Sequence, residues 1–331
     1  MRAQVLERPA PVDHAPLVER VRHEPLPGPG EVQVEVGACA VCRTDLQIVE
    51  GDLAAKTLPI VPGHQVVGRV VVQGEGVDRP AVGERVGIAW IAGTCGECRF
   101  CRSERENLCE QATFTGWDRD GGYAELVTAR AEFVHPLPQS ADPVEVSPLM
   151  CGGVIGYRCL KVAGVQPGDR LGLYGFGASA TVVIQVALHW GCEVYVATRS
   201  EREQERARGL GATWAGPYDE RPPVPLDHAI TFAPVGDVVV EALRSVDRGG
   251  TVTVNAIHLD HVPEFPYELL WWERVVRSVA NVTRQDVREL LDLALEIPIR
   301  TEFEVHPLEA ANEALGRVAR GDVSGAAVLA P

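Results

Sequence analysis

The sequence predicts an α/β chain that combines a doubly wound parallel sheet with a second, β-rich domain. The first observation behind this prediction is a change of pattern along the chain. Residues 1–150 alternate short β-branched segments with prolines and glycines, whereas the chain after Gly153 alternates apolar strands with helical segments. The second is a glycine turn between the first of these strands and its helix. With 331 residues, each domain can bury its own core.

Short strands and turns dominate the N-terminal part. The segment EVQVEVGAC at 31–39 alternates with the period of a strand, and VVGRVVVQGEGV at 66–77 is β-branched and interrupted by glycines. Prolines and glycines in PLPGPGE and PIVPGH mark turns between such segments. This pattern is typical of an irregular β-rich domain.

The second part alternates strands with helices, which predicts a parallel sheet covered by helices on both faces. The predicted strands are LGLYGF at 171–176, EVYVAT at 193–198, HAITF at 228–232 and TVTVNAI at 251–257. The predicted helices are 180–190, 200–212 and 237–246, followed by VRELLDLALEI at 287–297.

The chain is then expected to rejoin the first domain. Its tail predicts one helix at 307–322 and one edge strand at 325–331. We therefore expect one domain formed by residues 1–153 and 290–331, with a cysteine lobe at 93–110, and a second domain formed by residues 154–289.

Composition and charge exclude several classes of protein. Hydrophobic residues make up 46% and charged residues 23%, which are ordinary globular values, and the net charge is −15. Such a chain would be repelled by a phosphate backbone, so no nucleic-acid partner is expected. The N-terminus lacks the apolar core of a signal peptide, and Arg69 interrupts the apolar run VVGRVVV, so no membrane span is expected either. Nine cysteines without an export signal favour the cytoplasm.

Four cysteines have the spacing of ligands to one tetrahedral metal ion, most readily zinc. They are Cys95, Cys98, Cys101 and Cys109 in TCGECRFCRSERENLC. Gly96 favours a tight loop between the first two. Four sulfur ligands leave no open coordination position, which predicts a structural site. The alternatives are a disulfide cluster or unrelated thiols, and a zinc ribbon that binds nucleic acid, which the acidic charge disfavours.

A glycine turn predicts a dinucleotide site. It consists of Gly175, Phe176, Gly177, Ala178, Ser179 and Ala180. In a strand–turn–helix frame, such a turn lets a pyrophosphate approach backbone N–H groups at a helix N-terminus. Ala180 replaces the third glycine with another small residue. The alternative is a tight turn without a ligand.

The end of the second strand bears on the choice between NAD and NADP. Thr198, Arg199 and Ser200 stand where an NAD site usually places a carboxylate for the ribose hydroxyls. A hydroxyl residue followed by arginine could instead receive the 2′-phosphate of NADP, which is slightly favoured. The alternative is that Ser200 and Glu203 only form a capping box, while Arg199 covers the adenine.

A second group of metal-binding residue types lies outside the cysteine lobe. Cys42 is followed by Arg43, Thr44 and Asp45, and Gly63 precedes His64. Cys151 stands where the β-rich part ends and is a plausible third ligand. A cysteine and a histidine alone do not make a site, so the interpretation depends on the whole set.

Taken together, these motifs resemble the zinc-dependent alcohol dehydrogenases of the medium-chain dehydrogenase/reductase superfamily, and most closely the bacterial propanol-preferring type. The resemblance covers essentially the whole chain. It implies a GroES-like catalytic domain, a Rossmann domain that binds NAD or NADP, two zinc ions per subunit and a homo-oligomer, either dimer or tetramer. The implied reaction interconverts small primary alcohols and aldehydes.

The resemblance also implies roles for individual residues. Cys42, His64 and Cys151 would bind a catalytic zinc that lowers the pKa of a bound hydroxyl. Thr44 would accept the alcohol proton while hydride moves to the nicotinamide. Asp45 would hydrogen-bond the second nitrogen of His64, and Arg43 would pair with the cofactor pyrophosphate.

Two positions depart from the pattern of the family. Gln47 replaces a histidine that ends the proton relay in many relatives, so proton release would pass through water or another group. Gln65 replaces a glutamate beside His64, and the loss of that charge would leave the zinc site more electropositive. Neither change removes a zinc ligand.

Trp90 and Trp117 are the candidate walls of the substrate pocket, where large rings would favour small or unbranched alcohols. The alternative for both is ordinary core packing. The remaining histidines have no companion ligands at useful spacing: His14, His23, His135, His189, His228, His258, His261 and His306.

Alternative functions remain open at this stage. A polyol, amino-alcohol or aryl-aldehyde enzyme of the same superfamily would share the zinc and hydride chemistry. A non-catalytic, cofactor-binding relative would be expected to have lost a catalytic ligand, yet Cys42, His64, Cys151 and Thr44 are all present.

Overall fold

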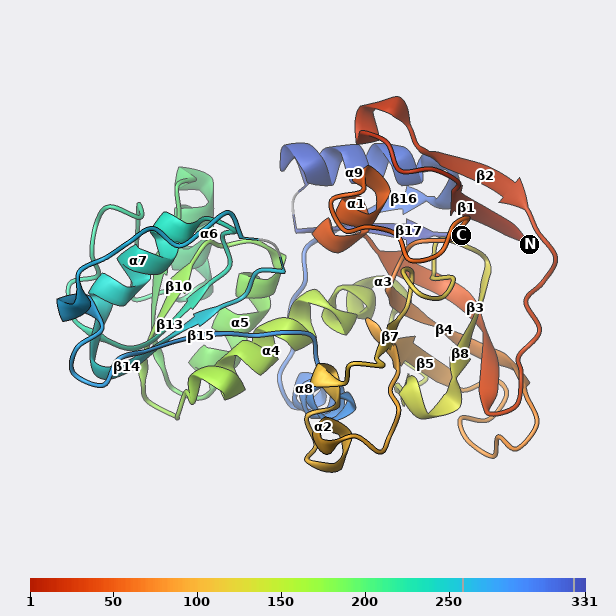
Figure 1. The fold of residues 1–331 in the computed structure, drawn as a ribbon, viewed down its shortest axis with the longest axis horizontal. Coiled ribbons are helices and arrows are strands. Elements are labelled where there is room, and N and C mark those ends of the chain that lie inside the picture. The colour runs from red at the N-terminus through yellow and green to blue at the C-terminus, as the bar shows by residue number, and fades with distance from the viewer. Residues whose placement is uncertain (258, 324) are drawn as a thin grey trace. The chain divides into compact units, whose positions relative to one another are not determined.

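The computed structural model describes residues 1–257, 259–323 and 325–331, and the chain divides into two compact units (Figure 1). The first unit comprises Met1–Gly152, Asn281–Asp292 and Arg300–Pro331, and the second comprises Gly153–Ala280 and Leu293–Ile299. His258, one of the histidines without companion ligands in the sequence, lies outside the described residues.

A seven-stranded sheet forms the centre of the first unit. Its strand order is β16-β17-β3-β4-β5-β9, and β8 pairs with β3. Only the β16–β17 pair is parallel. The strands are β3 (Glu31–Ala40), β4 (Gln65–Gln73), β5 (Arg85–Ile88), β8 (Leu126–Arg130), β9 (Val134–Pro136), β16 (Phe303–Pro307) and β17 (Ala326–Ala330).

Smaller elements surround this sheet. The strand pairs are β1 (Arg2–Leu6) with β2 (Leu17–Val21) and β6 (Ile91–Gly93) with β7 (Thr113–Phe114). The α-helices are α1 (Arg43–Glu50), α2 (Arg99–Arg102), α3 (Pro143–Val146) and α9 (Ala311–Arg320), and α8 (Arg284–Glu296) crosses between the units. The 3₁₀ turns are η1 (Val12–His14), η2 (Glu106–Leu108), η3 (Ala131–Phe133), η4 (Ser147–Met150) and η6 (Leu308–Ala310).

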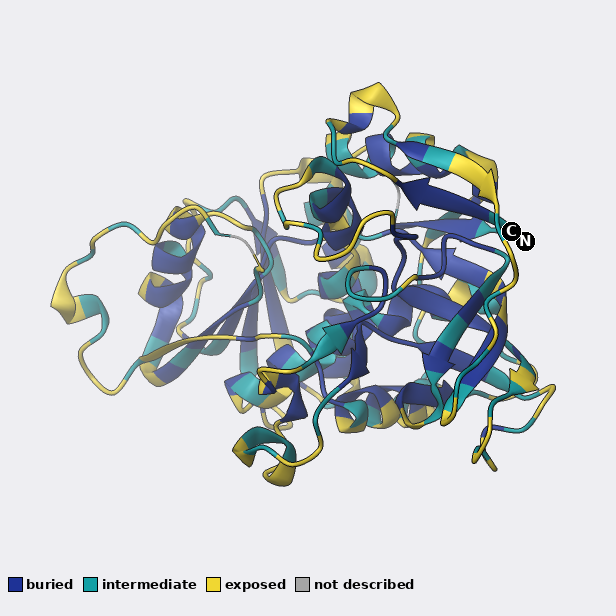
Figure 2. Ribbon diagram, turned by 45° about the vertical axis from the view of Figure 1, so that its right-hand side comes forward, coloured by how far each residue is buried: buried dark blue, intermediate teal, exposed yellow. Residues whose placement is uncertain are grey.

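The sheet and the helices beside it bury one apolar core, seen as dark blue strands in Figure 2. Val32 and Val34 of β3 and Ile48 of α1 are completely buried in it. Alternating apolar side chains on β3 therefore fix which face of the strand points inward, as the sequence pattern predicts.

The second unit contains a six-stranded sheet in which every neighbouring pair is parallel. Its order is β12-β11-β10-β13-β14-β15. The strands are β10 (Arg170–Tyr174), β11 (Glu193–Ala197), β12 (Trp214–Gly216), β13 (Leu226–Thr231), β14 (Val246–Val254) and β15 (Val275–Ser278). The helices are α4 (Gly152–Ala163), α5 (Ala178–His189), α6 (Glu201–Leu210) and α7 (Gly236–Ser245), with the 3₁₀ turn η5 (Tyr267–Leu269).

The strand order reverses at β10, which is the doubly wound arrangement that the alternating pattern predicts. Helix α5 leads from β10 to β11, whereas α7 leads in the other direction from β13 to β14. Because parallel crossovers are right-handed, these two helices cover opposite faces of the sheet. The crevice at such a reversal point, beyond the carboxyl ends of the strands, is where α/β sheets bind ligands.

The structure corrects the prediction of an edge strand at the C-terminus. Strand β17 lies inside the sheet, between β16 and β3, because the short strand β16 covers its other side. All but the last residue of β17 are buried, which an edge position would not achieve. The short strands β12, β15 and β16 were not predicted from the sequence.

The chain returns to the first unit at Asn281 rather than at residue 290. The N-terminal turn of α8 belongs to the first unit because Arg284 forms an ion pair with Glu106, at 2.6 Å between Nη2 and Oε2. No helix among the described residues is long and apolar enough to cross a membrane.

Candidate functional site

Three residues that are far apart in the sequence lie together in the first unit. Cys42 caps the N-terminus of α1, His64 immediately precedes β4, and Cys151 lies between η4 and α4. Their ligand atoms all lie within 4.8 Å of one another. Two sulfurs and one imidazole nitrogen at such distances form a three-ligand group that suits zinc with an open fourth position.

Asp45 holds two of these residues in place. One carboxylate oxygen accepts hydrogen bonds from the Gly63 backbone at 3.2 Å and from His64 Nδ1 at 2.9 Å. The other accepts from the Cys42 backbone N–H at 2.8 Å. Asp45 and His64 are completely buried. This carboxylate therefore fixes the imidazole orientation and directs its second nitrogen toward the cysteines.

The second nitrogen of His64 fits a metal ligand. Among the described residues, buried Nε2 has no hydrogen-bond partner. An orphaned buried nitrogen costs free energy unless something binds it, and a metal ion held by the two neighbouring thiolates would do so. The charge of Asp45 outweighs the opposing effect of burial and raises the His64 pKa to about 10. Because a metal ion binds the neutral imidazole, zinc would displace the proton from Nε2 on binding.

Only glycine fits at position 63. Its φ is +97°, and a Cβ atom there would lie 2.4 Å from the Tyr123 ring and 2.9 Å from the Cys39 sulfur. The close approach of Tyr123 explains why Gly63 precedes His64.

Thiolate formation at Cys42 is favoured by its neighbour. A hydrogen bond from Cys151 holds the pKa of the Cys42 thiol well below its ordinary value. The buried Thr44 hydroxyl lies 3.7 Å from Cys42 Sγ. Arg43 is exposed at the start of α1.

Gln65 has a structural role in addition to the loss of charge that the sequence predicts. Its Nε2 donates to the Ala40 carbonyl at 3.2 Å, and its Oε1 accepts from the Gly152 N–H at 3.4 Å. The amide thus joins the segments that carry Cys42 and Cys151. Its place beside His64 was the only signal in the sequence.

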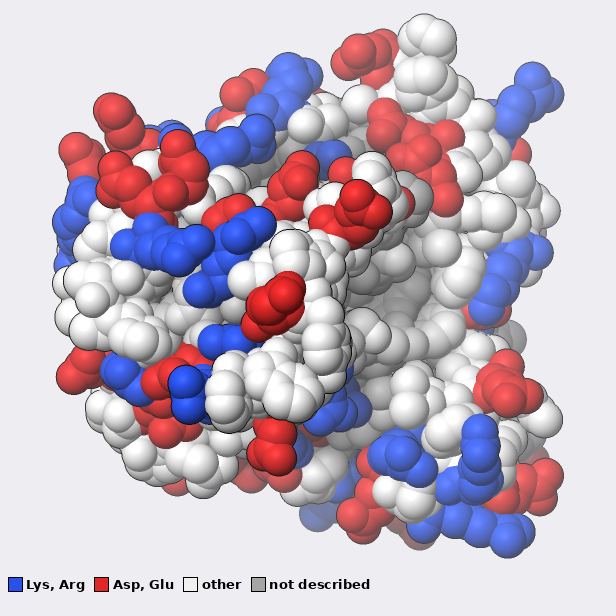
Figure 3. Space-filling model, turned by 60° about the vertical axis from the view of Figure 1, so that its left-hand side comes forward, with Lys and Arg blue, Asp and Glu red and all other residues white. Residues whose placement is uncertain are grey.

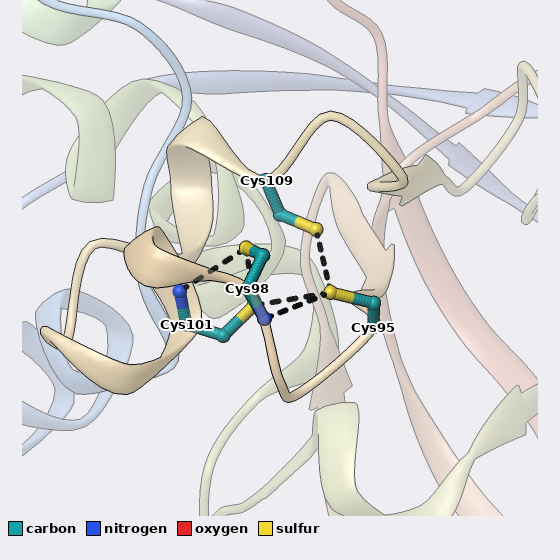
Figure 4. Close-up of side chains that lie close together, drawn as sticks. All are labelled: Cys95, Cys98, Cys101 and Cys109. Atoms are coloured by element: carbon teal, nitrogen blue, oxygen red, sulfur yellow. Dashed lines mark hydrogen bonds between the residues drawn. The ribbon is translucent and has the colours of Figure 1, made fainter.

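The four cysteines of the lobe converge on one point (Figure 4). The sulfur–sulfur distances are 3.5 Å from Cys98 to Cys101, 3.6 Å from Cys109 to Cys95 and 3.9 Å from Cys95 to Cys101. Four sulfurs placed tetrahedrally at about 2.3 Å from zinc would lie about 3.8 Å apart. The lobe therefore fits a zinc ion.

These distances exclude the disulfide alternative, because bonded sulfurs lie about 2.05 Å apart and all nine cysteines are free. Backbone N–H groups already point at two of the sulfurs: Cys98 N lies 3.4 Å from Cys95 Sγ, and Cys101 N lies 3.5 Å from Cys98 Sγ. Hydrogen bonds from the backbone of Glu97 and Cys98 lower the pKa of Cys95 to about 7.

The glycine turn of the second unit occupies the predicted place between β10 and α5. Gly175 has a φ of +94°, and a Cβ atom there would lie 3.1 Å from the Ala233 nitrogen. A Cβ at Gly177, the N-cap of α5, would meet open space. Ala180 is completely buried against the sheet. The open N-terminus of α5 fits the approach of a pyrophosphate.

At the end of β11, Thr198 makes a contact that the sequence does not predict. The buried Thr198 hydroxyl donates to the Glu203 carboxylate at 2.6 Å. Ser200 Oγ accepts from the Glu203 N–H at 3.3 Å, as a helix cap does, while Arg199 is exposed. Thus only half of the predicted capping box forms, because the carboxylate turns to Thr198.

Trp90 lies beside the three-ligand group. Its ring meets His64 edge-on with centroids 4.8 Å apart and stacks on Phe114 at 5.0 Å. Trp117 stacks on Trp90 at 5.9 Å, with an interplanar angle of 11°. The two tryptophans predicted as pocket walls therefore form one aromatic stack next to a candidate metal ligand.

Comparisons with known proteins agree with this geometry. Residues 28–139 match the model of the alcohol dehydrogenase GroES-like domain, and residues 180–296 match that of the zinc-binding dehydrogenases. The chain is 48% identical over 335 aligned positions to a protein of Mycobacterium tuberculosis named probable alcohol dehydrogenase, covering 99% of this chain and 97% of the relative. It is 37% identical to an alcohol dehydrogenase of Geobacillus stearothermophilus, with 91% of each chain covered.

Solved structures are similar over the whole chain. The alcohol dehydrogenase of Aeropyrum pernix has a TM-score of 0.88 and 27% identity, with both chains fully covered. A NAD-dependent alcohol dehydrogenase has a TM-score of 0.90 at 24% identity, and this likeness concerns the fold. From the relatives, the matched domains and the metal-ligand geometry together, the chain belongs to the zinc-type alcohol dehydrogenases of the medium-chain dehydrogenase/reductase superfamily.

Proposed function

We propose that this chain interconverts small primary alcohols and aldehydes, using zinc and a nicotinamide cofactor. One observation carries the proposal: a Cys42–His64–Cys151 group in which His64 is buried and both cysteines are partly buried. Asp45 directs the His64 nitrogen that has no hydrogen-bond partner among the described residues. Family membership supports the same reaction class.

Each residue of the group has a distinct task. When bound by Cys42, His64 and Cys151, zinc would supply a Lewis acid that polarises the substrate oxygen. The hydroxyl of Thr44 would accept the alcohol proton, since it is buried beside Cys42. Asp45 would keep the His64 ring fixed throughout turnover. Gln47 cannot titrate, so the proton would leave through water or another group.

We propose two zinc ions per chain, one in the three-ligand group and one in the cysteine lobe. The second ion would be structural because Cys95, Cys98, Cys101 and Cys109 fill its coordination shell. Metal analysis of the purified protein tests this stoichiometry, and one ion per chain would contradict it.

The nicotinamide cofactor would supply the hydride acceptor. The open turn at Gly175–Ala180 would hold its pyrophosphate, and Arg43 would add a positive charge. We propose a preference for NADP, in which Arg199 pairs with the 2′-phosphate. Glu203 opposes this preference, because its carboxylate lies on Thr198 and would repel a phosphate. Dissociation constants of NAD⁺ and NADP⁺, measured in wild type and in Glu203→Gln, separate the attraction of the 2′-phosphate by Arg199 from its repulsion by Glu203.

We propose small or unbranched alcohols as substrates, because Trp90 and Trp117 place a stack of large rings beside His64. Polyol, amino-alcohol and aryl-aldehyde substrates are the alternatives within the superfamily. Faster turnover of bulky secondary alcohols than of 1-propanol and 1-butanol would overturn this proposal.

We also propose a homo-oligomer, a dimer or a tetramer. Every residue of strand β15 is exposed at an edge of the parallel sheet, and Trp271 and Trp272 beside it are about half exposed. An exposed strand edge with large apolar side chains favours pairing with another chain. Light scattering after size-exclusion chromatography measures the mass, and a monomer would contradict the proposal.

Charge and redox state support the remaining assignments. On the face shown in Figure 3, Lys and Arg lie interspersed with Asp and Glu, and the whole chain carries −15, so we propose no nucleic-acid partner. Nine free cysteines, seven of them in metal-binding groups, support a reducing compartment, and we propose the cytoplasm.

The first experiment measures initial rates of 1-propanol oxidation with NAD⁺ and NADP⁺ side by side. Turnover with either cofactor supports the reaction class, and faster turnover with NADP⁺ assigns Arg199 to the phosphate. The absence of turnover with both cofactors and with all alcohols would overturn the proposed function in favour of a non-catalytic relative.

A further inference from the structure

A hydrogen-bonded path joins the cysteine lobe to the ring beside His64, and it passes through the side chain of Asn281. The Oδ1 atom of Asn281 accepts a 3.1 Å hydrogen bond from the Trp90 indole N–H. Its Nδ2 atom donates to the Asn107 carbonyl at 3.2 Å. Asn107 belongs to the 3₁₀ turn η2, which directly precedes the lobe ligand Cys109.

The partners determine the orientation of the amide. An indole N–H can only donate and a backbone carbonyl can only accept, so one orientation of the Asn281 amide satisfies both. A carboxylate at this position could not donate to Asn107, and an apolar side chain could serve neither partner. Residue 281 therefore needs a side chain that is donor and acceptor at once.

The backbone around Asn281 is well supported. Its φ of +54° lies in the left-handed region, which asparagine adopts more readily than most residues. Just beyond it, Thr283 and Asp286 cap α8 reciprocally: the Thr283 N–H donates to Asp286 at 2.8 Å, and the Asp286 N–H donates to Thr283 Oγ1 at 3.1 Å. Arg284 donates hydrogen bonds from Nε and Nη2 to the carboxylate of Glu106 in the lobe. The amide thus projects from a fixed segment.

Trp90 depends on this amide for its polar end. The side chain is 93% buried, with 7% exposed, and its faces and edge contact Phe114, Trp117 and His64. Among the described residues, the indole N–H has one hydrogen-bond acceptor, Asn281. Without that acceptor, a buried N–H would lose its partner, and a tilt of the ring would be the way to regain one.

We propose that Asn281 is a positioning residue that sets the tilt of Trp90, and thereby the discrimination between unbranched and branched alcohols, and that it links this tilt to the lobe. The inference rests on the proposed function, in which Trp90 borders the substrate. Asn281 touches neither substrate nor metal ligand in this scheme, and it acts through Trp90.

The test is a double-mutant cycle with Asn281→Gly and Trp90→Phe. Glycine suits the positive φ and deletes the amide, while phenylalanine keeps a ring but has no N–H. The measurement is the ratio of kcat/KM for 1-propanol to that for 2-methyl-1-propanol. We expect Asn281→Gly to lower this ratio about tenfold, and to leave it unchanged when Trp90 is already phenylalanine, because coupled residues are not additive.

Gln285→Ala is the matched control. Gln285 lies on the same segment but is exposed, and its side chain contacts Glu289 and Arg288. The ratio and the melting temperature should stay at the wild-type values. An Asn281→Gly effect that persists in the Trp90→Phe background would overturn the proposal, since Asn281 would then act without Trp90.

A second readout does not need activity. The near-ultraviolet circular dichroism difference between wild type and Trp90→Phe reports how rigidly the indole is held. The same difference taken in the Asn281→Gly background should shrink at least about twofold, and an unchanged difference would overturn the positioning role. If the wild type turned over no alcohol, the proposed function would fail, while this readout would still decide whether Asn281 holds Trp90.

Discussion

The two cysteine-rich groups of this chain are built in opposite ways. The lobe takes its four ligands from one loop, residues 95–109, and arranges their sulfurs 3.5 to 3.9 Å apart. The Cys42–His64–Cys151 group collects its ligands from three separate segments and relies on Asp45 to orient one of them. The lobe is therefore a local structure, whereas the other group exists only once the sheet of the first unit has formed.

The comparison shows what each construction allows. Four thiols close a coordination shell and leave nothing to react, so the lobe can only stabilise. Three ligands held by surrounding residues leave one position open at a partly buried site, which is the requirement for catalysis at a metal ion.

The sharpest way to break this comparison is Cys42→Ser. We expect kcat for 1-propanol to fall by more than about 10³-fold, because a Lewis acid contributes several kcal/mol to the transition state. The zinc content should fall by one ion per chain while the circular dichroism of the fold is kept. Cys192→Ala, a buried thiol outside both groups, is the matched control and should retain activity. Retention of activity in Cys42→Ser would refute the catalytic assignment.

The lobe should respond in stability instead. We expect Cys101→Ser to lower the free energy of unfolding by about 3 kcal/mol, as the loss of a structural metal does, and the melting temperature by roughly 6–12 °C. Scanning calorimetry of the zinc-loaded proteins measures this change. Below the new melting temperature, kcat should stay within about tenfold of wild type, and an inactive but equally stable variant would assign the lobe a role in chemistry.

Asp45→Asn tests how far the Cys42–His64–Cys151 group depends on the residue that orients His64. The amide can accept from Cys42 or from His64 but cannot offer two acceptor oxygens, so the imidazole is held less firmly. We expect zinc affinity of the three-ligand group to fall about 10–100-fold. Competition with a chromogenic chelator measures the affinity, and an unchanged value would mean that Asp45 does not support the ligand.

Lowering the pH should reduce the free energy of unfolding of the first unit through protonation of His135 on β9. Burial, with Arg288 and Arg284 nearby, lowers the His135 pKa to about 3. The folded pKa lies below the unfolded value of about 6.5, so this stabilisation is complete above pH 6.5 and is lost as the pH falls toward 3. At pH 5 the loss amounts to about 2 kcal/mol.

His135→Leu isolates this effect from the acid release of metal, which both proteins share. Urea unfolding at pH 7 and at pH 5 should show a smaller pH-dependent loss in the variant than in wild type. An equal loss of unfolding free energy between pH 7 and pH 5 in both proteins would show that His135 does not cause it.

The features that the sequence predicts by itself are formed within one short segment, whereas those formed by distant segments are not predicted. The spacing of Cys95, Cys98, Cys101 and Cys109 predicts the lobe by itself, because a short loop can bring its ligands together. The glycine turn is predicted by its place between a strand and a helix. By contrast, Cys42, His64 and Cys151 could be assigned to one site only through the resemblance. The number of residues between ligands on separate strands and loops does not indicate how far apart they lie in space.

Other features escaped prediction for physical reasons. Trp90 and Asn281 are 191 residues apart, and no local pattern signals their hydrogen bond. Strand β17 was predicted as an edge strand because its neighbour β16, with the sequence FEVHP, is too polar to be recognised as a strand. The Glu203 carboxylate had two available partners, and only the folded backbone at Thr198 decides between them.

The position of β17 has a consequence for the order in which the protein is made. Leu329 of β17 pairs with Cys39 of β3, and the Val41 N–H donates to the Ala327 carbonyl, one residue before Cys42. During synthesis, β3, which leads to the first ligand, therefore completes its pairing only after β17 has been made, long after Cys42 itself. The four lobe cysteines lie within residues 95–109, so the lobe can bind its ion before β17 is made, whereas the sheet beside Cys42 is incomplete until then.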